Sequence, residues 1–282
     1  MNDLIQMGVL SAVAIACGLI GPFLVLKKMV MFANSLSHTV LLGIALAFLL
    51  MGGPLFSLPT LLIGALLAAL MTAFFTEGLV RLFRLQEDAS IGLVFTALFA
   101  LGITVVTFFM RDVHLGLDAV MGNADILQLS DLKLASTLVG LNLIVVIVFF
   151  RQLQIISFDQ NLAKALGVRC SFFHFLLLFL SAMTCIGAFR AVGVLLVLAF
   201  LVGPFLTARI FCNRLPWLLF WTPVIGVIAS VSGTLVSRFL FEYCNLALST
   251  SGIVATLIGL FYCLAKWVSS ATIVSCKKEF PS

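Results

Sequence analysis

The sequence has little charge. Only 10% of its 282 residues are Asp, Glu, Lys or Arg, and 63% are apolar, whereas soluble domains carry about 25% charged residues. Apolar runs recur along the chain at the length of roughly 20 residues that a helix needs to cross a bilayer. We therefore predict an all-α, polytopic membrane protein with no room for a separate soluble catalytic domain. The net charge of +5 is too small and scattered to indicate nucleic-acid binding.

Motifs that carry enzyme chemistry are also missing. The sequence has no glycine-rich Walker-type loop for a nucleotide and no H-E-x-x-H pair for zinc. Its seven cysteines form no C-x-x-C pair, so we interpret them as small buried apolar residues rather than as a disulfide framework or a thiolate metal site. The chain is thus not expected to be an enzyme or to hold a resident cofactor.

The apolar runs predict a single transmembrane domain over residues 1–282. Nine spans are expected, at about residues 4–26, 29–50, 58–76, 89–110, 134–150, 171–189, 192–211, 218–236 and 252–268. A turn is expected at Gly52–Pro54, and a short interfacial helix in the segment from Arg111 to Lys133. Eight spans remain an alternative, because the hairpin at Arg190 is short and the segment 238–251 is mixed in character.

The distribution of basic residues predicts the orientation of these spans. With alternating sides, one set of links holds twelve of the sixteen Lys and Arg residues and the other set holds four. Because basic residues accumulate in cytoplasmic loops, the C-terminus is placed in the cytoplasm and the N-terminus outside. The smaller set consists of Arg111, Lys133, Arg190 and Arg238.

A polar island interrupts the second predicted span. His38 lies ten residues beyond Lys28, which at 1.5 Å per residue is about 15 Å into the membrane. Asn34, Ser37 and His38 fall at i, i+3 and i+4 and share a helix face. An ionisable residue at such depth is a candidate functional site. The alternative is that His38 and Asn34 hydrogen-bond neighbouring helices, and Ser37 is better explained as a small packing residue.

A second candidate site lies in a polar link that the orientation places in the cytoplasm, at residues 157–168. Asp159 is suited to cap a short helix. Ala163, Leu166 and Gly167 are spaced to lie on one helix face, and Gly167 suits the left-handed C-terminal position. Such a helix can dock into a groove on a partner, although an ordinary loop with a capped turn is the alternative.

Five stretches resemble the signatures of one family, the membrane permease subunits of ABC importers for zinc, manganese and iron. Taken together they are far more specific than any one of them, and they follow in order over nearly the whole chain. The stretches are residues 34–38 with 43–45, residues 87–92, residues 117–132, residues 158–168, and residues 192–196 with 203–209.

The resemblance implies a fold like that of vitamin B12-type ABC importer permeases, in a bacterial inner membrane. Two permeases, either copies or paralogues, would form one pathway. A cytoplasmic ABC ATPase dimer would drive alternating access, and an extracytoplasmic metal-binding protein would deliver the ion. The cargo would be a divalent ion of manganese, zinc or iron, and the sequence does not decide among them.

The family's functional residues carry over to two places in this sequence. Its acidic residue and histidine of the second span, taken as the metal-handling pair, fall on Asn34 and His38. Its ATPase-coupling segment falls on the stretch that contains Asp159, Ala163, Leu166 and Gly167. An amide at position 34 cannot neutralise a divalent ion as a carboxylate does, so a carboxylate from a paralogous partner is one way to complete the site.

Two other functions compete with this interpretation. A secondary transporter driven by an ion gradient usually has several buried carboxylates or broken helices, and no deeply buried Asp or Glu is evident in the predicted spans. A purely structural membrane scaffold is disfavoured by the imidazole of His38.

Overall fold

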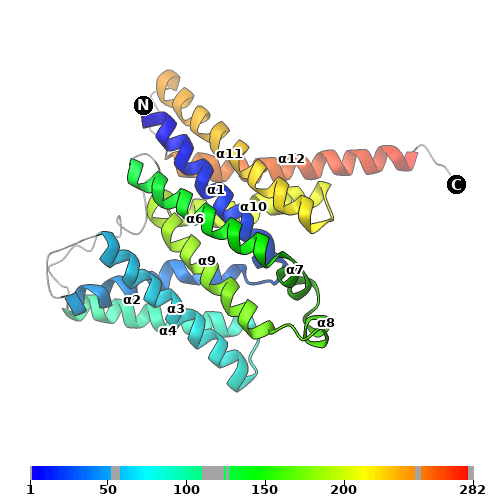
Figure 1. The fold of residues 1–282 in the computed structure, drawn as a ribbon. Helices are drawn as coiled ribbons and strands as arrows, with labels where there is room; N and C mark the ends of the chain where they lie inside the picture. The colour runs from blue at the N-terminus through cyan, green and yellow to red at the C-terminus, as the bar shows by residue number, and fades with distance from the viewer. Residues whose placement is uncertain (1, 52–57, 110–123, 125–126, 245–248, 279–282) are drawn as a thin grey trace. The chain divides into compact units, whose positions relative to one another are not determined.

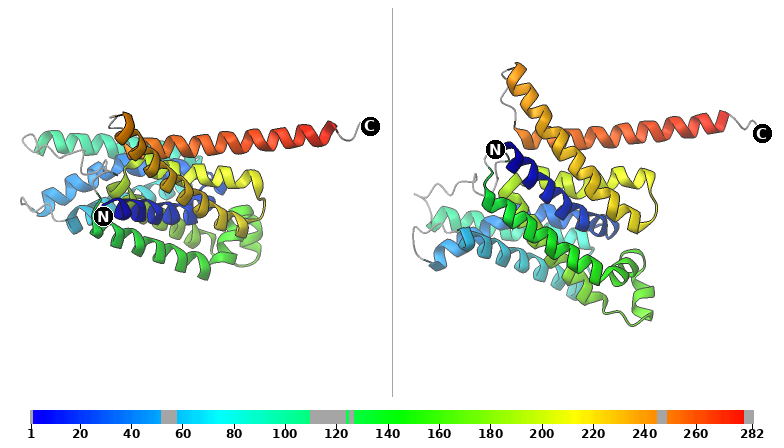
Figure 2. Two further views of the ribbon diagram at one scale, coloured as in Figure 1. Left: turned by 90° about the horizontal axis from the view of Figure 1, so that it is seen from above. Right: turned by 45° about the horizontal axis from the view of Figure 1, so that its top comes forward.

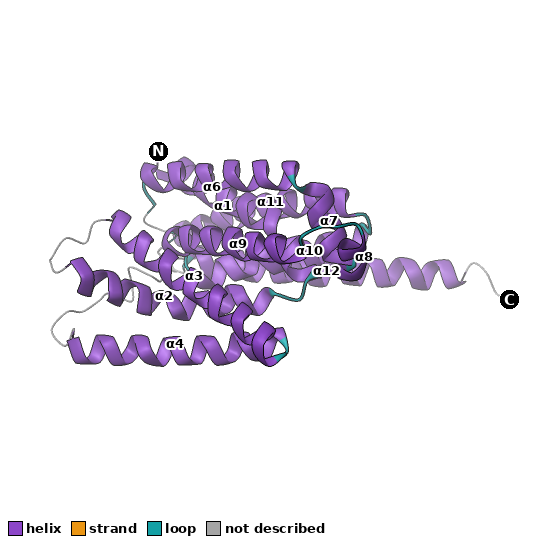
Figure 3. Ribbon diagram, turned by 60° about the horizontal axis from the view of Figure 1, so that its bottom comes forward, coloured by secondary structure: helices purple, strands orange, loops and turns teal. Residues whose placement is uncertain are grey.

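In the computed structural model, residues 2–51, 58–109, 124, 127–244 and 249–278 are described, and all regular secondary structure among them is helical (Figure 3). Nine helices in these ranges are long and apolar enough to cross a membrane, which confirms the nine predicted spans. They are α1 (Asn2–Leu26), α2 (Val30–Met51), α3 (Leu58–Phe83), α4 (Glu87–Phe109), α6 (Leu129–Val148), α9 (Cys170–Val192), α10 (Val194–Phe211), α11 (Leu215–Cys244) and α12 (Thr250–Lys278). Two short helices, α7 (Phe150–Phe158) and α8 (Gln160–Ala165), lie between α6 and α9.

Several predicted helix boundaries are wrong. Helix α6 begins at Leu129 rather than at residue 134, and α12 continues past residue 268 to Lys278. Helix α3 continues past Thr76 to Phe83, and α11 continues through Arg238 to Cys244. The predicted break at Arg190 lies at Gly193 instead, where φ is 88° and ψ is 160°. A charged residue does not end a membrane helix, because a long side chain can carry its charge to the interface, whereas a positive φ favours glycine. The predicted turn at residues 52–54 and the segment 111–123 lie outside the described residues.

The chain divides into two compact units, each assembled from separate stretches of sequence. The first unit comprises Met1–Pro22, Ala124–Val139 and Leu195–Ser282, and the second comprises Phe23–Asn123 and Gly140–Val194. Helices α1 and α6 each begin in the first unit and end in the second. The single transmembrane domain stays a prediction.

Close approach of helices holds the first unit together. Gly21 of α1 lies against the backbone carbonyl of Leu201 on α10, so that a Cβ atom would not fit. The Gln6 side chain donates a hydrogen bond of 2.9 Å to the carbonyl of Ala124. Helix α12 packs against α11 (Figure 2). Small residues permit such contacts in a bilayer, where apolar surface alone gives helices little reason to associate.

The second unit is built around α2, which contacts α3, α4 and α9; α2, α3 and α4 lie side by side in Figure 1. Gly43 of α2 and Gly64 of α3 face each other so closely that a side chain on either would meet the other's backbone. Leu42 packs with Val94 and Leu98 of α4. These contacts fix the rotation of α2 and therefore determine which helix the His38 side chain faces.

Candidate functional site

The His38 side chain lies on the α4 side of α2. Its ring centroid is 5.6 Å from that of Phe95 and 5.4 Å from that of Phe99, both on α4. Within the single chain His38 is nevertheless exposed, and Asn34 is half-buried. An imidazole exposed within a membrane-spanning helix is unfavourable in lipid, so this face of α2 suits a water-filled path or another subunit better.

Phe95 and Phe99 were not found by the sequence analysis. Their i, i+4 spacing in a span predicts a shared helix face, but nothing in the sequence tells which helix that face meets. The neighbouring hydroxyls of the polar island are engaged locally. Ser37 donates a 2.6 Å hydrogen bond to the Asn34 carbonyl, and the buried Ser35 donates to Phe32. This agrees with the interpretation of Ser37 as a packing residue.

Nothing in the described part of the chain completes a metal site around His38. No group of three or more His, Cys, Asp and Glu side chains there could hold a metal ion. The site as described consists of one imidazole and, four residues earlier on the same helix, one amide.

The predicted coupling segment forms α8 and the turns on either side of it. Asp159 accepts hydrogen bonds from the backbone N–H groups of Asn161 (2.8 Å) and Leu162 (3.1 Å), and Gly167 has a φ of 73°. Both local predictions, the cap and the left-handed glycine, are confirmed. The shared helix face is wrong, because α8 ends at Ala165: Ala163 is fully buried whereas 60% of Leu166 is exposed.

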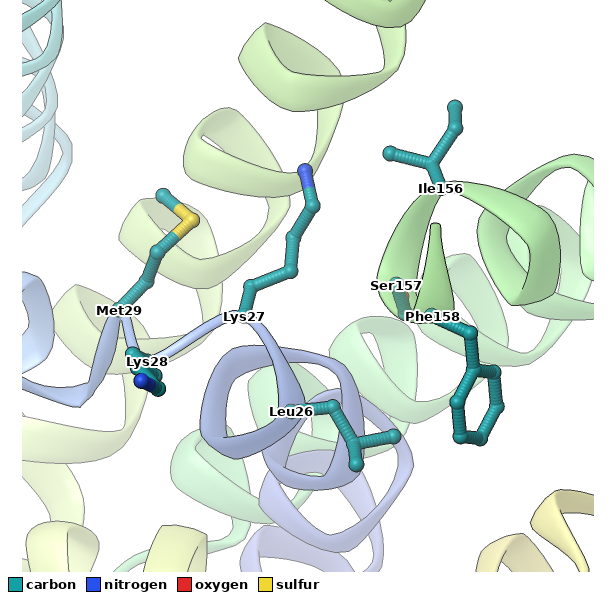
Figure 4. Close-up of a pocket in the computed structure, with 7 residues that line it drawn as sticks. All are labelled: Leu26, Lys27, Lys28, Met29, Ile156, Ser157 and Phe158. Carbon is teal, nitrogen blue, oxygen red and sulfur yellow. The ribbon is translucent and has the colours of Figure 1, made fainter. Parts of the chain in front are cut away.

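A pocket lies beside this segment, between the α1–α2 link and the end of α7. Its volume is about 180 Å³, and its lining residues are Leu26, Lys27, Lys28, Met29, Ile156, Ser157 and Phe158. Figure 4 shows the residues of the α1–α2 link on one side of it and those of α7 on the other. The α1–α2 link and the end of α7, which are far apart in the sequence, thus meet around this pocket in the second unit.

A polar cluster joins three elements near the same end. Arg81 Nε lies 2.6 Å from Glu77 Oε1 on α3, and His174 Nε2 of α9 lies 3.1 Å from Glu77 Oε2. Lys27 Nζ lies 3.4 Å from His174 Nδ1. Arg81 also hydrogen-bonds the Ser171 hydroxyl. The sequence does not predict this cluster, because the predicted third span ends at residue 76 and leaves Glu77 and Arg81 in the link that follows.

Nine apolar spans within the described residues, with an imidazole inside the second of them, indicate a polytopic membrane protein of the transporter class. A model of the ABC 3 transport family matches residues 1–269, and the chain belongs to that family. The chain is therefore an integral membrane protein and a permease subunit rather than an enzyme, as the sequence predicted.

Relatives and solved structures agree with this assignment. The chain is 36% identical over 291 residues to the manganese transport system membrane protein MntD of Bacillus subtilis, covering 98% of this chain and 94% of that one. It is 34% identical to the chelated iron transport system membrane protein YfeD of Yersinia pestis, covering 79% and 72%. It is also similar to PsaBC of Streptococcus pneumoniae, solved with a Fab, with a TM-score of 0.74, 28% identity and coverage of 92% and 89%.

Proposed function

We propose that this permease carries divalent transition metal ions inward through the membrane as part of an ATP-driven importer. The observation that carries the proposal is the imidazole of His38, exposed within a spanning helix and held beside two aromatic rings. Imidazole is a good ligand for zinc and iron ions and binds manganese more weakly. Relatives named for manganese and for iron transport support this cargo class without selecting one metal.

In this proposal His38 and Asn34 form a transient binding site for the ion on its way through the membrane. His38 supplies a nitrogen ligand and Asn34 a neutral carbonyl oxygen, so neither offsets the ion's charge. The ion would therefore bind weakly unless a second permease, either a copy or a paralogue, faces the same path and adds a carboxylate. Weak binding favours transport, because an ion must leave a site as readily as it enters.

The partners follow from the family and from the exposed surface of the coupling segment. A cytoplasmic ATPase dimer would dock where Phe158, Leu162 and Leu166 present apolar surface, each more than half exposed. The cap at Asp159, the buried Ala163 and the turn at Gly167 would maintain the backbone conformation of that surface. An extracytoplasmic metal-binding protein would deliver the ion. We further propose a bacterial inner membrane as the location, with the C-terminus in the cytoplasm and the N-terminus outside, an orientation that the positions of the basic residues support.

The test is uptake of manganese, iron and zinc by the complete complex reconstituted in vesicles, with and without ATP. The wild-type complex should accumulate at least one of these metals only with ATP, and uptake by His38→Ala should fall at least about tenfold, which is 1.4 kcal/mol or more. Ser37→Ala is the matched control on the same face and should retain uptake. Uptake driven by an ion gradient without ATP would favour a secondary transporter, and unchanged uptake by His38→Ala would remove His38 from the pathway.

A further inference from the structure

Glu77 is the centre of a directional hydrogen-bond chain across three elements. A lysine ammonium can only donate, so Lys27 donates to Nδ1 of His174 and the ring carries its proton on Nε2. That Nε2–H donates to Glu77 Oε2, and Arg81 donates to Glu77 Oε1. Both carboxylate oxygens of Glu77 thus accept a hydrogen bond. One comes from His174 on α9, and the other comes from Arg81, one turn further along α3.

The cluster is unsuited to hold a transported cation. Glu77 and His174 have ligand atoms for a metal, but a lysine and an arginine flank them and would repel a divalent ion. Only 21% of the Glu77 side chain is exposed, and 13% of His174. A charge-assisted network in such a half-buried position is stronger than a surface ion pair. Its physical effect is to hold α9 and the α1–α2 link against α3.

The network lies immediately after the coupling segment. Ser171, the second residue of α9, is bonded by Arg81 and follows Gly167 by only four residues. Helices α7 and α8 both contact α9 as well. A displacement of the coupling segment is therefore passed to the first turns of α9, and from there through Arg81 and Glu77 to α3.

From α3 the contact continues to the helix that carries His38. A Cβ on Gly43 of α2 would meet the backbone carbonyl of Gly64 on α3, and a Cβ on Gly64 would meet that of Gly43, so the two backbones touch with no flexible side chain between them. Interlocked backbones resist sliding and transmit displacement. Every residue in this series belongs to the second compact unit.

We infer that Glu77 and His174 are positioning residues that join the coupling segment to α2, so that movement at α8 moves the His38 face. The inference rests on the proposed function, because it concerns how ATP use at α8 becomes metal movement at His38. Without the contact between Glu77 and His174, here called the joint, only the packing of α9 against α2 and α3 remains, and less of the displacement of α9 reaches those two helices. Loss of the joint should thus separate ATP hydrolysis from transport rather than abolish both.

The experiment measures metal transported per ATP hydrolysed by the complete reconstituted complex, with whichever of manganese, iron and zinc the wild-type complex accumulates. Glu77→Gln and His174→Leu should each lower this ratio about tenfold, within the range usual for coupling between sites, while ATP hydrolysis continues. His174→Gln keeps a hydrogen-bond donor toward Glu77 and should restore most of the ratio. The double variant Glu77→Gln/His174→Leu should be no worse than either single one, because both remove the same joint.

Thr184→Val is the matched control. It removes a buried interhelical hydrogen bond of 2.9 Å from Asn142 on α6 to the same helix α9, away from the joint. It should lower thermal stability yet keep the ratio of metal to ATP. The ratio is measured on assembled complexes, so if Glu77→Gln does not assemble, His174→Leu and His174→Gln decide the question.

The inference is overturned if Glu77→Gln or His174→Leu lowers transport and hydrolysis in equal proportion, as a merely structural defect would. Failure of the proposed function gives a different result. In that case the wild-type complex itself transports no manganese, iron or zinc although it hydrolyses ATP.

Discussion

The imidazole of His38 meets the ring of Phe99 edge to face, with centroids 5.4 Å apart and an angle of 63° between the planes. The ring of Phe95, one turn earlier on α4, packs against the same imidazole with the two centroids 5.6 Å apart. The two rings restrict the rotamers of His38 and so hold its imidazole in a defined orientation.

Phe99→Leu should therefore reduce metal uptake a few-fold without loss of the fold, because aromatic contacts of this kind are worth about 0.5–1.5 kcal/mol. Initial uptake rates in the reconstituted complex measure the effect. Phe175→Leu, which changes an exposed ring on α9, should leave uptake unchanged. Equal effects of the two substitutions would show that Phe99 contributes only general packing.

Asn34→Asp should strengthen metal binding on the pathway. A carboxylate offsets part of the ion's charge where the amide cannot, so the apparent affinity for manganese should rise about tenfold, or 1.4 kcal/mol. Turnover should fall if release becomes slow. Competition among manganese, iron and zinc during uptake is the measurement, with Asn34→Leu as the control that should weaken binding. Identical metal preference in all three proteins would place position 34 away from the ion.

Gly167→Val should weaken association with the ATPase. The φ of 73° at this position is strained for a residue with a Cβ and costs roughly 1–2 kcal/mol, although no neighbouring atom lies within 4 Å of that Cβ. Asn tolerates the left-handed region, so Gly167→Asn should retain binding. Co-purification of the ATPase compares the two variants. Full retention by Gly167→Val would show that the conformation of this turn does not matter for docking.

Gly43→Ala should destabilise the second unit by about 1–3 kcal/mol, the usual cost of forcing extra volume into a packed contact. The added Cβ would meet the carbonyl of Gly64 and the side chain of Ala68. Gly92→Ala on α4 places its Cβ in open space and should be neutral or slightly stabilising. Thermal unfolding of the purified protein in detergent distinguishes the two. A tolerated Gly43→Ala would mean that α2 and α3 separate easily.

The sequence predicts features that depend on local pattern and misses those that depend on how helices face one another. Apolar length predicts nine spans, and the residue type at Asp159 and Gly167 predicts a cap and a turn, because these depend on near neighbours. The contact between Glu77 and His174 joins residues 97 positions apart, and no periodicity reveals it. Likewise, the depth of His38 follows from counting residues, but its contacts with α4 follow from the packing of Gly43 against Gly64.

The exposure of His38 within the single chain has a consequence for biogenesis. A newly inserted copy that has not yet assembled with a second permease exposes this imidazole to lipid tails, which is energetically unfavourable for a polar group. Under the proposed pairing, assembly with a second permease covers the imidazole and removes the cost. Production of the subunit alone should therefore yield less stable protein than co-production, and His38→Leu should narrow that difference even though it abolishes transport.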